Sequence, residues 1–171
     1  NFLNPNLKEN ITPFLSHLSN KGISFTNCFA NGIRSAYGIG SILTSIPVIP
    51  GIPIISQVES GFKNNLINKT MNIFTDLEYK RFFLYGGDAD FDNLKGFCIA
   101  NGFNEVIDRD SPRFSNSKDG TMWGIYDHIV IDEINNIANS NTTDPFMITF
   151  FTTTNHDPFR IPKKYEQYFN N

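Results

Sequence analysis

Apolar residues recur every three or four positions in five stretches of the chain, and this spacing predicts amphipathic helices. Thr12 and Pro13 start the first helix, with a hydroxyl cap before a proline at the first helical position, and Gly22 ends it. The predicted helices cover residues 13–21, 36–46, 70–79, 91–100 and 123–138.

Shorter apolar runs lie between these helices and predict strands. Residues 23–29 alternate between apolar and polar side chains, whereas residues 146–151 form a nearly continuous apolar run that is typical of a strand buried on both faces. Two further strands are predicted at 81–85 and 105–108, and two loops at 47–65 and 109–121. Strands that alternate with helices predict an α/β fold, with a mostly parallel sheet in three α/β/α layers.

Polar residues follow three of the predicted strands. They are Arg34-Ser35 after the first, Gly86-Gly87-Asp88 after the second and Asn155-His156-Asp157 after the apolar run. The carboxyl ends of parallel strands lie on one edge of a sheet, where sites in α/β folds are found. We therefore expect these three groups to lie together.

Ser35 is predicted at a helix N-terminus, where free N–H groups and the helix dipole favour an anion such as a phosphoryl oxygen. A serine there can act as a nucleophile if a base or a metal ion activates its hydroxyl, and it can equally be an ordinary N-cap. Arg34 can bind a phosphate with two hydrogen bonds, or it can extend into solvent.

Asp88 and His156 each allow two interpretations. Asp88 can accept hydrogen bonds from substrate hydroxyls, but Gly-Gly-Asp is also a plain turn. His156 can serve as a general acid, a donor to an anion or a metal ligand, or it can cap the turn before Pro158. Asp127 and His128 form a pair that often binds metals, but their place in a predicted amphipathic helix assigns them to its solvated flank.

Composition excludes several classes of protein. The 171 residues carry a net charge of −3 with 18% charged and 40% apolar residues, which excludes a basic nucleic-acid-binding arm and a disordered acidic tail. The most apolar stretch, 46–55, is interrupted by prolines and a glycine, so no membrane span is predicted. Cys28 and Cys98 lie in apolar surroundings and are expected to be buried thiols.

Five segments occur in an order that resembles the lipoteichoic-acid-synthase-like branch of the sulfatase and alkaline phosphatase superfamily. The segments are Phe25–Ser35 with Leu43–Pro47, Tyr85–Phe91, Asn101–Asp108, Trp123-Gly124 and Thr152–Phe159. The resemblance runs through nearly the whole chain. It implies an incomplete alkaline-phosphatase-like fold, with residues 1–171 as a single partial sulfatase-like catalytic domain.

The resemblance also implies an activity and residues for it. It implies a metal-dependent phosphoglycerol transferase that acts on lipid-linked or glycan phosphodiesters through a covalent phosphoryl intermediate. The family nucleophile, usually Thr, falls on Ser35, which is also a metal ligand, and the substrate-binding histidine falls on His156. Asp88 and Arg34 are the further substrate-binding candidates.

The chain departs from the family pattern at two kinds of position. The family's Trp and Arg fall near Phe91 and Asn93, which weakens the case for a phosphoglycerol head group. Formylglycine sulfatases would need Pro and Arg where Tyr37 and Ile39 stand. A sulfatase-family hydrolase and a phosphoethanolamine transferase remain alternatives.

The family's divalent metal, Mn²⁺, Mg²⁺ or Zn²⁺, needs further ligands that the resemblance places before and after this chain. We therefore expect the chain to be the middle of a longer protein and to be inactive and metal-free alone. The resemblance implies a bacterial cell-surface or periplasmic location, with a membrane anchor outside this chain. The net charge of −3 predicts no nucleic-acid partner. A non-catalytic domain that binds a glycan or lipid head group is the alternative from another class.

Overall fold

The computed structural model describes residues 6, 12–48, 50–51, 53–56, 69–117, 119–140 and 143–168. They fall into two compact units, 1–30 and 31–171. In the first, α1 (Pro13–Ser19) begins after Thr12 with proline in its first turn, as the sequence predicts. The assignment of the whole chain to one partial catalytic domain stays a prediction.

The predicted strand at 23–29 is wrong. These residues have no strand assignment, and the side chains of Ile23, Phe25 and Phe29 are exposed. A strand is stabilised by a ladder to a neighbour, and the described part of this unit offers none. Alternation of side chains alone therefore misled the prediction.

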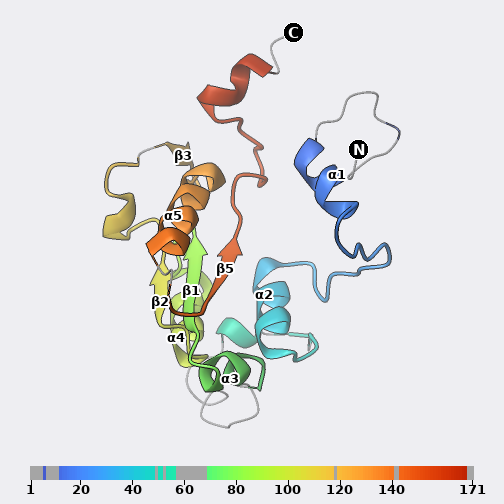
Figure 1. The fold of residues 1–171 in the computed structure, drawn as a ribbon, viewed down its shortest axis with the longest axis vertical. Helices are drawn as coiled ribbons and strands as arrows, with labels where there is room; N and C mark the ends of the chain where they lie inside the picture. Colours follow the sequence, from blue (N-terminus) through green and yellow to red (C-terminus); the bar gives the residue numbers. More distant parts are fainter. Residues whose placement is uncertain are drawn as a thin grey trace. The chain divides into compact units, whose positions relative to one another are not determined.

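Three parallel strands form the sheet of the second unit (Figure 1). β1 (Lys80–Tyr85) lies in the middle, between β2 (Glu105–Ile107) and β5 (Phe146–Phe151). Tyr85 pairs with Phe151 at the carboxyl end of the two longer strands, and Leu84 pairs with Ile107. All three strands therefore end at one edge. The sequence predicts this for β1 and β5, whereas the third strand that it places there, at residues 23–29, is not formed.

Side chains of the central strand alternate between two apolar clusters. Phe83 packs with Leu43, Met71 and Phe97 of α2 (Ser35–Thr44), α3 (Lys69–Asp76) and α4 (Leu94–Ala100). Phe82 and Leu84 instead pack with Val130 and Ile137 of α5 (Asp127–Ser140). Burying each of these apolar side chains contributes about 1.5–3 kcal/mol. Helices cover both faces of the sheet, which confirms the three-layer α/β/α prediction.

Two short strands replace the start of a predicted helix. β3 (Gly120–Thr121) and β4 (Gly124–Ile125) form an antiparallel pair, and α5 begins only at Asp127. The prediction of a helix from residue 123 is therefore wrong for its first turn. Short 3₁₀ turns complete the described elements: Ile54–Ser56, Phe91–Asn93, Pro112–Phe114 and Lys163–Tyr168. Residues 57–65 of the predicted 47–65 loop lie outside the described residues.

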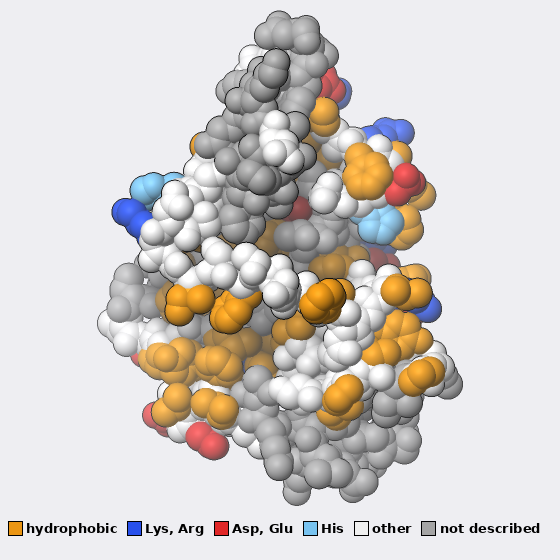
Figure 2. All heavy atoms as spheres, turned by 90° about the vertical axis from the view of Figure 1, so that its right-hand side faces the viewer, with side chains coloured by type: hydrophobic (Ala, Val, Ile, Leu, Met, Phe, Trp, Pro, Cys, Tyr) orange, Lys and Arg blue, Asp and Glu red, His pale blue; other side chains and the backbone are white. Residues whose placement is uncertain are grey.

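The two cysteines differ in exposure. Cys98 is buried in α4 as predicted, but Cys28 is exposed, so the prediction of two buried thiols is wrong for Cys28. Apolar side chains, drawn in orange in Figure 2, also lie at the surface. Within 31–171 the exposed apolar residues include Ile33, Ile42 and Ile73. No described helix combines the length and the apolar character that crossing a bilayer requires.

Candidate functional site

A pocket of about 280 Å³ lies at the carboxyl edge of the sheet. Three strand ends and the start of α2 contribute to it. Its polar lining consists of Ser35, Asp88, Asp92, Arg109, Thr152, Thr153 and His156, and its aromatic lining of Tyr85, Phe91, Trp123 and Phe151. Residues from five separated segments thus meet in one concave site of the kind that binds small ligands.

Ser35 is the first residue of α2, and Arg34 occupies the N-cap position with an extended backbone. The carbonyl of Arg34 accepts hydrogen bonds from the N–H groups of Tyr37 and Gly38. The N-cap interpretation of Ser35 is therefore wrong. Ser35 is exposed, and within the described residues its hydroxyl has no hydrogen-bond partner in the protein. The hydroxyl is free to meet a ligand beside the unpaired N–H groups of the first helical turn.

Two arginine–aspartate pairs border the pocket. Arg109 Nη2 lies 2.8 Å from Asp88 Oδ2, and Arg34 Nη2 lies 3.4 Å from Asp92 Oδ2. The N–H of Arg109 donates to the carbonyl of Gly87, which ties the end of β2 to the end of β1. The two carboxylates at the pocket are therefore each balanced by a guanidinium group.

Tyr85 lies at the end of β1 and stacks on Phe151, with ring centroids 4.6 Å apart. Burial raises the pKa of its phenol, the charge of Asp88 raises it further, and Arg109 opposes both. The phenol is therefore protonated at neutral pH and can donate a hydrogen bond into the pocket.

His156 lies against Trp123, with ring centroids 4.4 Å apart. The indole Nε1–H of Trp123 donates to the carbonyl of Asp157 at 2.7 Å, and Nδ1 of His156 lies 3.1 Å from the same oxygen. A carbonyl only accepts, so this geometry places a proton on Nδ1 and leaves Nε2 for a ligand.

The structure brings together most of the residues selected from the sequence. Ser35, Asp88 and His156 line the same pocket, and Arg34 lies next to it through its pair with Asp92. Sequence reasoning missed Arg109 and Trp123. Arg109 follows a predicted strand, so the strand-end rule applied to the other groups would have selected it, whereas Trp123 was hidden in a predicted helix.

The described residues do not fit a divalent metal on their own. Within the described part of the chain, no three His, Cys, Asp or Glu side chains are grouped as metal ligands. Asp88 and Asp92 are each paired with an arginine, so the serine hydroxyl lacks the anionic partners that such an ion needs. The metal-ligand role of Ser35 stays a prediction.

The assignment of Asp127 to a solvated flank is wrong. Both Asp127 and His128 are half-buried, and the Asp127 carboxylate accepts the N–H groups of Thr153 and Thr154. Burial lowers the pKa of His128, as does the charge of Lys164, while Asp119, Asp132 and Asp127 oppose the shift.

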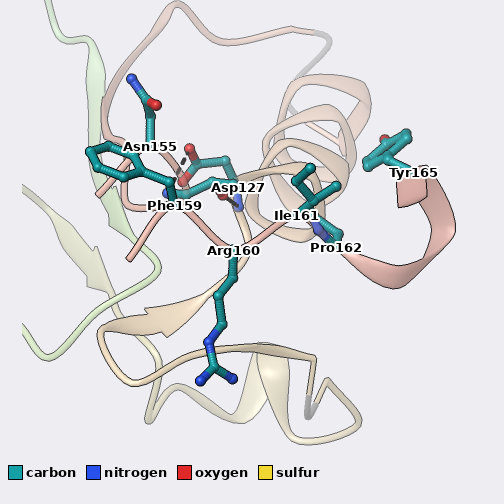
Figure 3. A pocket seen from close by; sticks show the side chains of 8 residues that line it. Asp127, Asn155, Phe159, Arg160, Ile161, Pro162 and Tyr165 are labelled. Atoms are coloured by element: carbon teal, nitrogen blue, oxygen red, sulfur yellow. Dashed lines mark hydrogen bonds between the residues drawn. The ribbon is translucent and has the colours of Figure 1, made fainter. Parts of the chain in front are cut away.

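A second hollow, of about 460 Å³, lies between the start of α5 and residues 154–165. Figure 3 shows Asp127 at its inner end and Arg160 extended away from it. Phe159, Ile161 and Tyr165 contribute apolar surface to it. It contains none of the residues selected as catalytic or substrate-binding.

Comparison with known proteins supports one family. The family model described as Sulfatase matches residues 3–171. A solved protein of the alkaline phosphatase superfamily from Vibrio parahaemolyticus is 27% identical with a TM-score of 0.69, over 81% of this chain and 33% of that one. The lipoteichoic acid synthase LtaP from Listeria monocytogenes is 21% identical with a TM-score of 0.64, over 76% of this chain and 31% of that one, and shows the fold. The chain spans about a third of the length of these structures.

Proposed function

The chain belongs to the sulfatase family, whose superfamily contains transferases and hydrolases, and on this premise we propose that it is the central part of a phosphodiester transferase. The proposed nucleophile is Ser35, and the proposed substrate is a lipid-linked phosphodiester. One observation carries the proposal. Ser35, Asp88 and His156 come from three separated segments and line a single pocket at the start of a helix.

The start of α2 suits the binding of a phosphoryl group. Unpaired N–H groups and the helix dipole favour an anion there, and Arg109 adds a guanidinium on the pocket wall. Arg109 already pairs with Asp88. A phosphoryl oxygen would therefore share the guanidinium group with the carboxylate of Asp88 or displace that carboxylate from it. These groups bind and orient the phosphorus beside the hydroxyl of Ser35.

The proposed reaction has two displacements. Ser35 Oγ forms a bond to phosphorus while the bond from phosphorus to the lipid alcohol breaks, and the serine proton ends on the departing alcohol. In the second displacement an acceptor hydroxyl oxygen forms the new bond to phosphorus while the bond from Ser35 Oγ to phosphorus breaks, and the acceptor's proton ends on the serine oxygen. No redox partner is needed.

His156 and Trp123 are proposed to hold the head group. Nε2 of His156 is available to a phosphoryl or hydroxyl oxygen, and the indole offers an apolar face beside it. Arg109 and Trp123 bring to this pocket the two side-chain types that the family pattern places near Phe91 and Asn93. This supports a phosphoglycerol transferase over the two alternatives, a sulfatase-family hydrolase and a phosphoethanolamine transferase.

We retain a divalent metal as a proposed cofactor of the complete domain, because the superfamily generally uses such ions. The described residues lack a ligand set for such an ion. We also propose a membrane-anchored, cell-surface location for the full-length protein. The support is the structural likeness to LtaP.

The full-length protein with bis(p-nitrophenyl) phosphate as the probe tests the proposal. We expect Ser35→Ala to lower turnover at least about a thousandfold and to abolish a phosphoryl adduct detected by mass spectrometry after acid quench. Ser35→Thr keeps the hydroxyl and should retain turnover and adduct. Ser41→Ala makes the same change six residues further along α2, outside the pocket, and is the matched control. Turnover and adduct in Ser35→Ala would reject Ser35 as the nucleophile, whereas a wild-type protein with neither turnover nor adduct would favour the non-catalytic binding domain.

A further inference from the structure

The loop after β5 carries His156 into the pocket, and its first residues are bound to the start of α5. Asp127 Oδ1 accepts the N–H of Thr153 at 2.7 Å, and Oδ2 accepts the N–H of Thr154 at 3.1 Å. In return the N–H of Asp127 donates to Thr154 Oγ1 at 2.7 Å. Figure 3 shows Asp127 at the helix start with dashed bonds to this loop. One carboxylate thus satisfies two backbone donors just past the end of the strand.

Residues 123–125, which precede α5, make two further bonds to the loop that carries His156. Trp123 Nε1–H donates to the carbonyl of Asp157 at 2.7 Å, and the hydroxyl of Thr153 lies 3.0 Å from the carbonyl of Ile125. Residues 123–127 therefore hold residues 153–157 at both ends, with His156 between the two attachments.

Asp127 is well placed to make its attachment rigid. It is the first residue of α5, where the helix dipole favours a carboxylate, and its bonds to N–H groups are charge-assisted. The helix behind it is anchored on the sheet by the fully buried Val130 and Ile137. The His156 loop is thereby tied to the core.

We propose that Asp127 is a positioning residue that acts on substrate through His156, by fixing the loop in which His156 stands. This inference rests on the proposed function, in which His156 binds the substrate. Loss of the carboxylate should leave the helix in place and allow His156 to move away from its position beside Trp123.

The test uses the full-length protein, the same phosphodiester probe and two asparagine variants. Asp127→Asn keeps the shape of the side chain but turns an amide N–H₂ group toward a backbone N–H. Asp132→Asn is the control, because it removes the same charge from an exposed position of α5. We expect Asp127→Asn to raise KM about tenfold with a smaller change in kcat, and Asp132→Asn to change neither.

The double variant separates positioning from general destabilisation. If Asp127 acts through His156, then Asp127→Asn combined with His156→Ala should be no worse than His156→Ala alone. Fully additive effects would overturn the positioning role. If His156→Ala leaves KM unchanged, the proposed function loses its substrate-binding histidine, and a readout without turnover then decides on Asp127.

That readout is amide hydrogen exchange and the emission of Trp123, isolated by subtracting the emission of a Trp123→Phe variant. In Asp127→Asn the amides of Thr153 and Thr154 should exchange faster and the emission should shift toward that of His156→Ala, while amides in the core half of α5 stay protected. Unchanged exchange and emission would overturn the inference. If Asp127→Asn fails to fold, Thr154→Val, which removes only the reciprocal bond, is measured in the same way and read by the same outcomes.

Discussion

Arg109 Nη2 lies 2.8 Å from Asp88 Oδ2, and this ion pair joins the carboxyl ends of β2 and β1 at the pocket wall. Both side chains are more than one third exposed, at 38% and 37%. Solvent therefore screens the pair, and it contributes only about 0–1 kcal/mol to folding. Its position at the pocket indicates a role in binding.

We expect Arg109→Ala to raise KM for the phosphodiester probe about tenfold to a hundredfold, because one or two charge-assisted hydrogen bonds to phosphate are lost. The melting temperature should change little. Arg113→Ala is the control, since Arg113 pairs with Glu105 and Glu133 away from this pocket. Equal KM values for the two variants would show that Arg109 does not bind the phosphoryl group.

The sequence predicted the sheet well because its signals are local. The apolar runs of β1 and β5 predict two strands, and both form. β1 is buried between two helical layers, whereas every residue of β5 is half-buried at the edge of the described sheet, so the prediction of burial on both faces is wrong for β5. The false strand at 23–29 shows the limit of this reasoning. Alternating apolar and polar side chains indicate a preference for a strand, but a strand also needs a neighbouring strand to pair with, and the local sequence does not reveal one.

The site was predictable as far as it follows strand ends. Asp88 and His156 were found in this way. Ser35 was selected because it follows a predicted strand, which is not formed, and because it lies at a helix start, which the structure contains. Trp123 was not found, because the apolar spacing of its segment predicts a helix. In the structure Gly124 adopts φ +145° and the segment forms a short pair of strands instead. The exchange of bonds between Asp127 and Thr154 joins segments 27 residues apart, and no local pattern encodes such a contact.

The two thiols should react differently. Burial raises the pKa of Cys98 to about 12, and its side chain is fully buried, whereas Cys28 is exposed. Since the thiolate is the reactive form, a thiol reagent such as iodoacetamide should label only Cys28 in the folded protein and both cysteines in denaturant. Peptide mapping measures this, and Cys28→Ser should leave the folded protein unlabelled. Labelling of Cys98 without denaturant would contradict its burial.

Gly124 should not tolerate a side chain. Its φ is +145°, and a Cβ there would collide with the carbonyl oxygen of Gly86. Gly124→Ala should therefore cost about 2–3 kcal/mol and lower the melting temperature by roughly 5–10 °C. Gly38→Ala is the matched control, because a Cβ on Gly38 meets no atom within 4 Å. As alanine favours helices, that change in α2 should stabilise the protein by about 0.5–1 kcal/mol. Similar melting temperatures for both variants would exclude the close approach of the two backbones.

His128 should make stability depend on pH on the acidic side of neutrality. Burial lowers the pKa of His128 in the folded state, the charge of Lys164 lowers it further, and Asp119, Asp132 and Asp127 only partly oppose this. Its ring lies between those of Tyr126 and Tyr165, with centroids 5.9 and 5.6 Å away. The unfolded chain, with an ordinary histidine pKa of about 6.5, then binds more protons than the folded protein.

The contribution of His128 to the free energy of unfolding is therefore fully present above a pH of about 6.5. It is lost as the pH falls through the lower pKa that His128 has in the folded protein. Urea unfolding at a series of pH values should show a steeper acidic loss of stability in the wild type than in His128→Gln, which cannot take up the proton. His17 and His156 are common to both proteins, so their contributions cancel in this difference. Lys164→Gln, which removes the nearby positive charge, should give an intermediate slope. Equal slopes in the wild type and His128→Gln would show that the folded protein binds the proton as readily as the unfolded chain.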